Sequence, residues 1–247
     1  MSVEVTVENG IMTITLNRPE ASNALNAATA EVIVESIDRA NADPDVRVIV
    51  LTGSGDKVFS AGMDLKAFAA GENMRVVGEA IQRVRTCRKP VIAAINGTAM
   101  AGGFELMLCC DLMVAADHAK FGIPEVKRGL VAAGGGTRLP RRIPLQVALE
   151  MGLTGEPISA QRALELGLVN RVVPAADVVA TAHQLAGLIT ANGPLAVQAT
   201  KQLMLDEIGP DNADDVAKAT AHVFSSEDAR EGATAFAQKR APEWKGR

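Results

Sequence analysis

The chain has 247 residues, of which 48% are hydrophobic and 22% are charged, so it can bury a sizeable core without disulfides or metals to hold it together. Its formal net charge is −4, its aromatic content is 3%, and it has no Tyr. This composition argues against a nucleic-acid partner, which would favour a basic surface and aromatic rings for base stacking.

The cysteines and the amino terminus indicate the cellular compartment of the protein. Cys87, Cys109 and Cys110 are odd in number and two are adjacent, which is typical of buried thiols in a reducing cytosol. The amino terminus lacks the basic and apolar segments of a signal peptide, and no apolar run reaches the roughly 20 residues of a spanning helix. We therefore expect a cytoplasmic protein with no membrane partner.

The chain opens with an expected hairpin and an amphipathic helix. Alternating apolar residues flank Asn9-Gly10, the strongest short hairpin signal. Helical spacing follows within residues 22–45, with Asn23 as the expected cap and Pro44 beyond the end.

A recurring order of strand, glycine turn and helix comes next. Residues 46–56 predict a buried strand that ends in Gly-Ser-Gly, and residues 59–68 lead into a short helix. A helix over about 72–85 and a buried strand over 90–97 repeat that order. Further strands are expected at 111–117, 119–124 and 170–174, and further helices at 144–155 and 159–169.

The strand signals stop at residue 193, and three helices are expected over 194–204, 212–226 and 226–240. Acidic residues near the starts of the last two suit the positive end of a helix dipole. We therefore divide the chain into residues 1–193 and 194–247. Trp244, flanked by charges, indicates either a docked end or a frayed one.

Several chemistries are disfavoured by spacing. His118, His183 and His222 are far apart and have no cysteine pair or acidic cluster nearby, so we expect no metal site. The chain has no G-x-S-x-G elbow, and its glycine runs miss the P-loop and dinucleotide-binding patterns. Cys87 lies among basic residues, which indicates either a thiol of lowered pKa or a solvated turn.

Two glycine turns remain, in the segments SAGMD and AMAGGFE. Each releases a strand into a helix start, where backbone amides have no partner within the helix. If the turns faced each other, the amides of Met63 and Gly102 would form an oxyanion hole. The alternative is two ordinary strand-to-helix turns.

Two acids accompany these turns. Glu105 lies one turn into its helix, where a capping acid would also be found. Glu125 follows Pro124 and precedes a basic pair, so it could equally form a surface ion pair. In one pocket, one acid could take a proton from water while the other gives a proton to carbon.

Six segments in register resemble the enoyl-CoA hydratase/isomerase (crotonase) superfamily over essentially the whole chain. They are LNRPEASNAL, FSAGMDL, INGTAMAGGFEL, FGIPEVKRGL, LTGEPISAQRALELGLVNRVV and FAQKRAPEWKGR. The resemblance implies an α/β fold, a crotonase-type spiral of ββα units in residues 1–193 with a C-terminal helical trimerisation region in residues 194–247. It also implies homotrimers or homohexamers.

The resemblance further implies an acyl-CoA substrate, with coenzyme A as part of that substrate and no separate cofactor. Met63 and Gly102 match the two amides that hold the thioester oxygen. Glu105 and Glu125 match the acids of hydratases, the first positioning and deprotonating water and the second exchanging the proton at C2.

The resemblance also implies residues that contact coenzyme A itself. Ala61 and Asp64 match the loop whose backbone meets the adenine. Lys57 and Lys66 lie where basic residues can meet the phosphates, although lysines on loops are often simply solvated. Lys239 resembles a contact to the coenzyme A of a neighbouring subunit.

The sequence departs from the common pattern at GLVAAGGGTRLPRR, in the loop that borders the acyl pocket of this family. Other segments look especially like carnityl-CoA dehydratase, which hydrates crotonobetainyl-CoA. The leading hypothesis is a 2-enoyl-CoA hydratase. The alternatives are carnityl-CoA dehydratase, an enoyl-CoA isomerase, and a non-catalytic acyl-CoA-binding protein.

Overall fold

The structure is a computed structural model that describes residues 2–128, 130–133, 136–206 and 225–247. It opens with the predicted hairpin, in which β1 (Val3–Glu8) pairs antiparallel with β2 (Ile11–Leu16). Asn9 and Gly10 have φ angles of 52° and 76°. A two-residue turn with both φ angles positive matches the twist of the flanking strands, which is why this dipeptide favours a hairpin.

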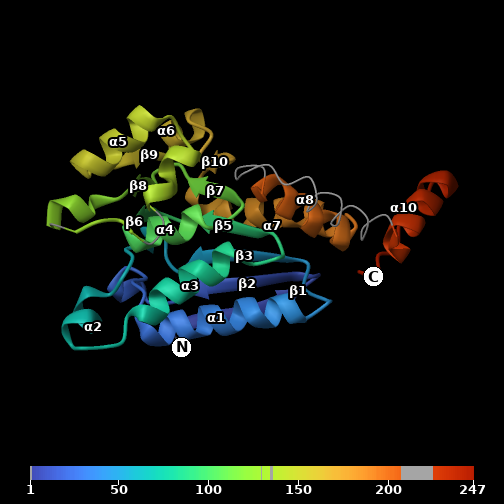
Figure 1. Cartoon of the computed structure of the whole chain (residues 1–247), viewed down its shortest axis with the longest axis horizontal. Helices are drawn as coiled ribbons and strands as arrows, with labels where there is room; N and C mark the ends of the chain where they lie inside the picture. The colour runs from blue at the N-terminus through green and yellow to red at the C-terminus, as the bar shows by residue number, and fades with distance from the viewer. Residues whose placement is uncertain (1, 129, 134–135, 207–224) are drawn as a thin grey trace.

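A six-stranded sheet forms the centre of the chain, in the order β1-β2-β3-β5-β7-β10 (Figure 1). From β2 onward the strands run parallel. Every residue of β3 and β5 is buried, as expected for parallel strands covered on both faces. The remaining bounds are β3 (Val48–Gly53), β5 (Val91–Ile95), β7 (Leu112–Ala116) and β10 (Arg171–Val173).

A second sheet of four short strands has the order β4-β6-β8-β9, and the first three run parallel. Its strands are β4 (Val58–Ser60), β6 (Thr98–Met100), β8 (Lys120–Gly122) and β9 (Ile158–Ser159). Each of β3, β5 and β7 is followed along the chain by one strand of this second sheet. The chain therefore winds through both sheets once per repeat, which confirms the predicted spiral of ββα units.

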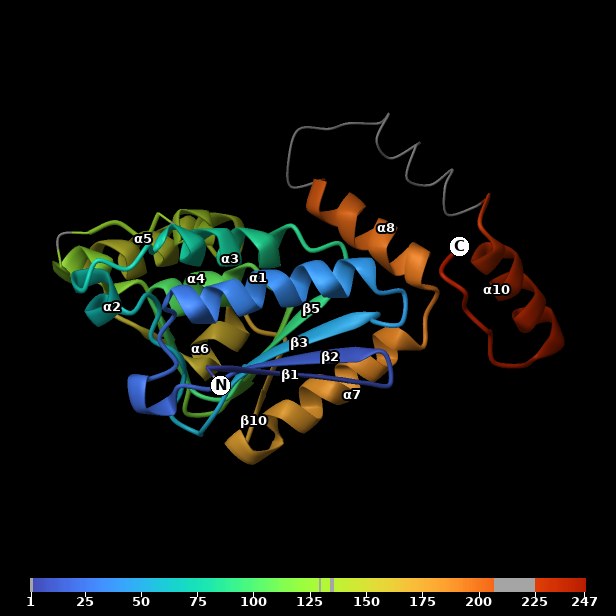
Figure 2. The ribbon, with the colours of Figure 1, turned by 90° about the horizontal axis from the view of Figure 1, so that it is seen from below.

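Helices cover both faces of the large sheet. Figure 2 shows α1 on one side of β1–β3 and α7 on the other, and α7 packs against β3, β5 and β7. The helices before residue 193 are α1 (Ala27–Ala42), α2 (Leu65–Ala69), α3 (Arg75–Arg85), α4 (Gly102–Leu108), α5 (Leu145–Thr154), α6 (Ala160–Glu165) and α7 (Val178–Thr190). Short 3₁₀ helices are η1 (Pro19–Ala21), η2 (Pro124–Arg128), η3 (Gly136–Arg141) and η4 (Ala175–Asp177).

The expected cap of α1 is wrong by three residues. Asn26, not Asn23, caps the helix, and its side chain accepts a hydrogen bond from the Thr29 amide at 3.0 Å. Asn23 has a φ angle of 51° and is buried, and its amide donates to the Ser54 and Val58 carbonyls. The Asn23 side chain therefore ties the chain before α1 to the loop that leads into β4.

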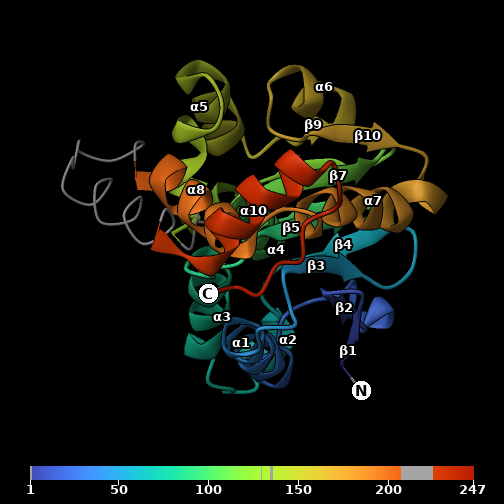
Figure 3. The ribbon, with the colours of Figure 1, turned by 90° about the vertical axis from the view of Figure 1, so that its right-hand side faces the viewer.

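In the C-terminal part, helices are described over 194–206 and 227–238, whereas residues 241–247 form neither helix nor strand. The expected helices over 194–204 and 226–240 are confirmed as α8 (Pro194–Asp206) and α10 (Glu227–Gln238), and the middle one falls largely on residues 207–224, outside the described residues. Figure 3, seen from the α10 side, shows both helices in front of the sheets. The division at residue 193 and the trimerisation role of this part stay predictions.

The end of the chain docks on the same chain. The Trp244 indole N–H donates to the Ala191 carbonyl at 2.8 Å. The Asp228 carboxylate accepts from the amides of Lys245 and Gly246 at 2.7 and 2.9 Å. The docked alternative for Trp244 is therefore confirmed.

None of the helices in the described part of the chain is long and apolar enough to cross a membrane.

A mostly buried ion pair fastens α8 to the sheet. Lys201 Nζ lies 2.7 Å from Asp111 Oδ2, and the two side chains are only 10% and 19% exposed. The same lysine donates to the Lys89 carbonyl at 2.9 Å, and Asp111 Oδ2 also accepts from the Val91 amide at 2.7 Å. The start of β5 and the turn before β7 are thereby bound to α8.

We predict that Lys201→Met lowers the free energy of unfolding by about 2 kcal/mol, because it leaves the Asp111 carboxylate buried without its cation. Arg83→Met is the control, since its pair with Asp38 is about half exposed. We expect that control to change stability by less than about 0.5 kcal/mol. Urea unfolding of both variants checks this, and equal effects would contradict it.

Candidate active site

The second sheet brings three functional segments to one edge. Ser60 of β4 pairs with Ala99 of β6, which in turn pairs with Phe121 of β8, all in parallel. The carboxyl ends of parallel neighbours lie side by side, so the segments that follow these strands meet. Those segments carry Met63 after β4, Gly102 after β6 and Glu125 after β8.

The first two turns lie against each other. A methyl group on Gly62 would fall 2.5 Å from the Gly102 nitrogen, and one on Gly102 would fall 3.4 Å from the Met63 nitrogen. The residues that precede the two amides, Gly62 and Ala101, have φ angles of 88° and 50°. Among the described residues, no hydrogen bond uses the amide of Met63 or Gly102. Two neighbouring amides available to one oxygen are what an oxyanion hole requires.

Packing beneath the turns fixes their distance. A methyl group on Gly103 would fall 2.2 Å from the Ser60 carbonyl oxygen, so the first turn of α4 lies directly on the backbone of β4. On the other side, the Leu25 amide donates to the Gly62 carbonyl at 2.7 Å, and the Asp64 amide donates to the Leu25 carbonyl at 2.9 Å. The Met63 turn is therefore held from both sides.

Asp64 anchors the far end of the Met63 turn. Its carboxylate caps α2 by accepting from the amides of Lys66 and Ala67, and it pairs with the Arg18 guanidinium at 2.9 Å. Burial by itself would raise the pKa of Asp64. The hydrogen bonds from Ala67, Arg18 and Lys66 outweigh that effect and lower the pKa below its ordinary value. The side chain is thus held ionised.

Glu105 points to η3. It is buried at 6% exposure, and its Oε1 accepts from the Gly136 amide at 2.8 Å. In a capping box the Ala101 amide would donate to Glu105, but that amide donates to the Gly122 carbonyl at 3.0 Å. The capping-box alternative is therefore wrong. The acid still lies in the first turn of α4, where the dipole favours it.

Glu125 lies in η2 and lines a cavity of about 300 Å³. Its Oε2 atom is removed from solvent. Gly136 lines the same cavity, so the residue that binds Glu105 stands in a wall shared with Glu125. The other lining residues are Ile123, Val126, Val131, Ala132, Thr137, Pro140, Ala148, Leu149, Gly152 and Leu153. Glu125 therefore lines a largely apolar cavity, and Glu105 binds one residue of the cavity wall.

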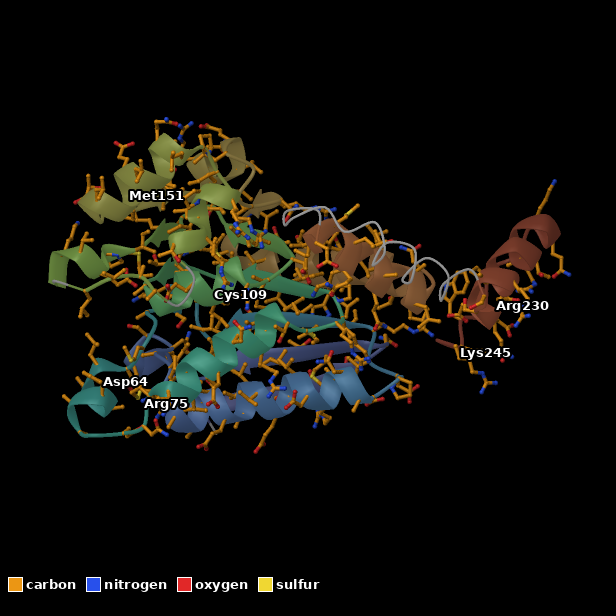
Figure 4. All side chains as sticks on the ribbon, viewed as in Figure 1. Asp64, Arg75, Cys109, Met151, Arg230 and Lys245 are labelled. Atoms are coloured by element: carbon orange, nitrogen blue, oxygen red, sulfur yellow. The ribbon has the colours of Figure 1, made fainter. Side chains whose placement is uncertain are left out.

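A more polar cavity of about 730 Å³ lies at the Met63 turn. Met63 itself lines it, together with Asp64, Lys66 and Arg18. Lys66 is exposed, in the first turn of α2. Ala61 is exposed beside it, and its amide donates to the Ser22 carbonyl at 3.0 Å. Figure 4 labels Asp64 in this region.

The sequence of this chain is similar to those of known proteins. The sequence profile described as enoyl-CoA hydratase/isomerase matches residues 6–247. The chain belongs to this family. A carnitinyl-CoA dehydratase from Proteus mirabilis is 42% identical over 259 aligned positions, which cover 100% of this chain and 99% of that protein.

Solved structures of family members agree closely with this one. An enoyl-CoA hydratase from Mycobacterium tuberculosis has a TM-score of 0.94 at 48% identity, covering 100% of this chain and 99% of that one. A carnitinyl-CoA hydratase from Mycobacterium avium has a TM-score of 0.80 at 44% identity, with coverage of 100% and 99%. The resemblance drawn from the six sequence segments is confirmed.

Two of the lysines assigned to coenzyme A, Lys57 and Lys239, do not line the polar cavity, and their assignments stay predictions. Lys57 is exposed at the amino end of β4, about 13 Å of extended chain from Ala61, and it does not line the polar cavity. Lys239 directly follows α10, at the opposite end of the chain from α2 (Figure 1). A contact from Lys239 to a neighbouring subunit stays a prediction.

Gly136 is the site residue that the sequence did not reveal. It belongs to the glycine run AAGGG, which the sequence offers only as a weak phosphate motif. The sequence signal that could have pointed to Gly136 is the departure of this glycine run from the family pattern. Only the tertiary structure shows that the Gly136 amide binds Glu105.

Cys87 is not a reactive thiol. It is buried, and burial raises its pKa despite the nearby positive charges of Lys201 and Lys89. The alternative of a lowered pKa is therefore wrong. The Cys87 side chain packs inward, although Arg85, Thr86 and Arg88 around it are exposed. Within the described residues, no group of three or more His, Cys, Asp or Glu side chains could hold a metal ion.

The close approach of the two turns can be tested by stability. Gly62 and Gly167 have similar φ angles of 88° and 72°, but a methyl group on Gly167 would meet nothing within 4 Å. We predict that Gly167→Ala costs about 1 kcal/mol from backbone strain alone. Gly62→Ala should cost about 2–4 kcal/mol, since the clash with Gly102 adds to the strain.

Thermal or urea unfolding of the two variants measures the difference. A cost for Gly62→Ala no larger than that for Gly167→Ala would show that the turns are not held in contact.

Proposed function

We propose that this family member is an enoyl-CoA hydratase, a lyase that adds water reversibly across the C2=C3 bond of a 2-enoyl-CoA thioester. One observation carries the proposal. The turns that carry the Met63 and Gly102 amides lie against each other, and Glu105, in the first turn of the helix that begins at Gly102, binds Gly136, which lines a cavity together with Glu125.

The amide pair acts on the thioester oxygen. When water adds at C3, negative charge moves to that oxygen in an enolate, and two preorganised N–H donors stabilise it. Neither donor has to give up a hydrogen bond to another described residue. The substrate therefore gains both bonds without breaking protein contacts.

The two acids move the protons. Glu105, oriented by the Gly136 amide, positions the water and accepts its proton as the oxygen bonds to C3. Glu125, on the wall of the cavity that Gly136 also lines, gives a proton to C2 as the enolate collapses. Dehydration is the reverse, in which Glu125 takes the C2 proton.

The two cavities suit the two ends of an acyl-CoA. The polar cavity with Arg18 and Lys66 fits the anionic coenzyme A portion, and the apolar cavity fits the acyl chain. Coenzyme A is then part of the substrate, and no separate cofactor is required. We further propose that the enzyme acts in the cytoplasm as a homotrimer or homohexamer.

A second candidate is the dehydration of a carnitinyl-CoA, which the 42% identity to carnitinyl-CoA dehydratases favours. Such a substrate carries a quaternary ammonium group, which proteins hold with aromatic rings or carboxylates. The residues described around the acyl cavity include no aromatic ring and only one carboxylate, Glu125. We therefore favour an uncharged acyl chain.

We predict that the protein removes the conjugated absorbance of crotonyl-CoA and longer 2-enoyl-CoAs, and that Glu125→Gln lowers kcat by about 10²–10⁴-fold. Coenzyme A binding should persist, because the acid lines only the acyl cavity. Glu156→Gln is the matched control, since Glu156 is exposed and pairs with Lys127. Full activity in Glu125→Gln would contradict this mechanism.

A mass readout of the same substrate panel, with crotonobetainyl-CoA included, separates the alternatives. Hydration adds one water, whereas isomerisation leaves the mass unchanged and moves the double bond. Binding without any product would identify a non-catalytic acyl-CoA protein. Faster turnover of crotonobetainyl-CoA than of every uncharged enoyl-CoA would overturn the preference for an apolar chain.

A further inference from the structure

A third cavity, of about 370 Å³, lies on the other side of η3 from the acyl cavity. Four arginines line it, from the end of α3 and from η3 and its extension: Arg85, Arg138, Arg141 and Arg142. Two acids also line it, Asp111 and Asp206. Guanidinium groups outnumber carboxylates by two to one in this lining.

The carboxylates do not neutralise the arginines. Asp111 is paired with Lys201 at 2.7 Å and accepts from the Val91 amide. Asp206 accepts from the Gln202 side-chain amide at 2.8 Å, and within the described residues it forms no ion pair with an arginine of the cavity. The cavity therefore keeps an excess of positive charge.

Two of the four arginines have structural tasks. Arg85 donates to the Gln82 side chain at 2.9 Å in the last turn of α3, and Arg142 donates to the Leu108 carbonyl at 3.0 Å where α4 ends. Cations at these helix ends are favourable in themselves. The side chains of Arg138 and Arg141, by contrast, form no hydrogen bond or ion pair with any residue in the described part of the chain.

The charges of three of these arginines act on Cys109 in the cavity wall. Cys109 lines it and lies in the middle of the molecule (Figure 4). Burial raises the pKa of its thiol to about 11, and the charges of Arg138, Arg85 and Arg142 act in the opposite direction.

The segment η3 separates this cavity from the acyl cavity. Its first residue, Gly136, binds Glu105, and Thr137 and Pro140 line the acyl cavity. Arg138 and Arg141, between and after them, line the basic cavity. A ligand held by those two arginines would be attached to the same short segment that orients Glu105.

We propose that this arginine-lined cavity binds a small anion of the phosphate class and that the bound anion holds η3 in place. Guanidinium groups match phosphate oxygens with paired, charge-assisted hydrogen bonds. Fixing η3 keeps the Gly136 amide on Glu105, so binding raises kcat. The effect on kcat rests on the proposed hydratase function, whereas the binding itself does not.

Isothermal calorimetry with inorganic pyrophosphate tests the site on the full chain. We expect saturable binding with one site per chain, weakened by about tenfold or more in Arg138→Gln/Arg141→Gln. Arg138→Lys/Arg141→Lys keeps the charge but loses the planar guanidinium group. Its affinity for pyrophosphate should lie between those of the parent protein and the glutamine variant. Arg162→Gln, on an exposed residue paired with Glu165, should bind as the parent does.

Lys66→Gln distinguishes this cavity from the predicted coenzyme A site. If pyrophosphate binding is lost in Lys66→Gln and kept in the arginine variant, the anion occupies the other cavity and the proposal is overturned. Absence of saturable pyrophosphate binding to the parent protein overturns the proposal as well.

Enoyl-CoA turnover measured with and without pyrophosphate tests the coupling. We expect kcat of the parent protein to rise with the half-saturation found by calorimetry, and kcat of Arg138→Gln/Arg141→Gln not to respond. Binding without any change in kcat would overturn the coupling to Glu105. If the protein hydrates no substrate, calorimetry still decides the anion site.

Discussion

The parallel pairing of β4, β6 and β8 is the constraint on which the candidate active site depends. It places the residues after each strand at a common edge, so that Met63, Gly102 and Glu125 meet although they are far apart in sequence. The glycine contact between the first two turns then sets the separation of the amides. A shift in that pairing would move the oxyanion donors and the second acid together.

The segment η3 plays the complementary role on the other side of the site. It supplies the amide that binds Glu105, part of the wall around the acyl cavity, and two arginines that face the basic cavity. These contacts come from a stretch of only six residues. The loop in which this chain departs from the common family sequence is therefore also the one that connects the acid to both cavities.

Polar side chains hold the frame around these elements. Asn23 joins the chain before α1 to the loop before β4, Arg18 and Asp64 hold the Met63 turn, and Lys201 joins α8 to Asp111. Each of these contacts satisfies a buried or half-buried polar group that would otherwise be costly. The same contacts that stabilise the fold thus also limit the movement of the site.

The sequence by itself determined the elements whose cause is local. Asn9-Gly10 adopts its hairpin turn because both positions tolerate positive φ, the buried strands follow from apolar runs, and the glycine turns at Met63 and Gly102 are visible as strand-to-helix junctions. Only the tertiary structure decided which polar groups form hydrogen bonds with each other. The caps show this, because Asn23 and Asn26 are alike in propensity and only packing directs Asn23 inward. Glu105 shows it again, since its partner Gly136 is 31 residues away, and no local pattern encodes a contact made across two folded segments.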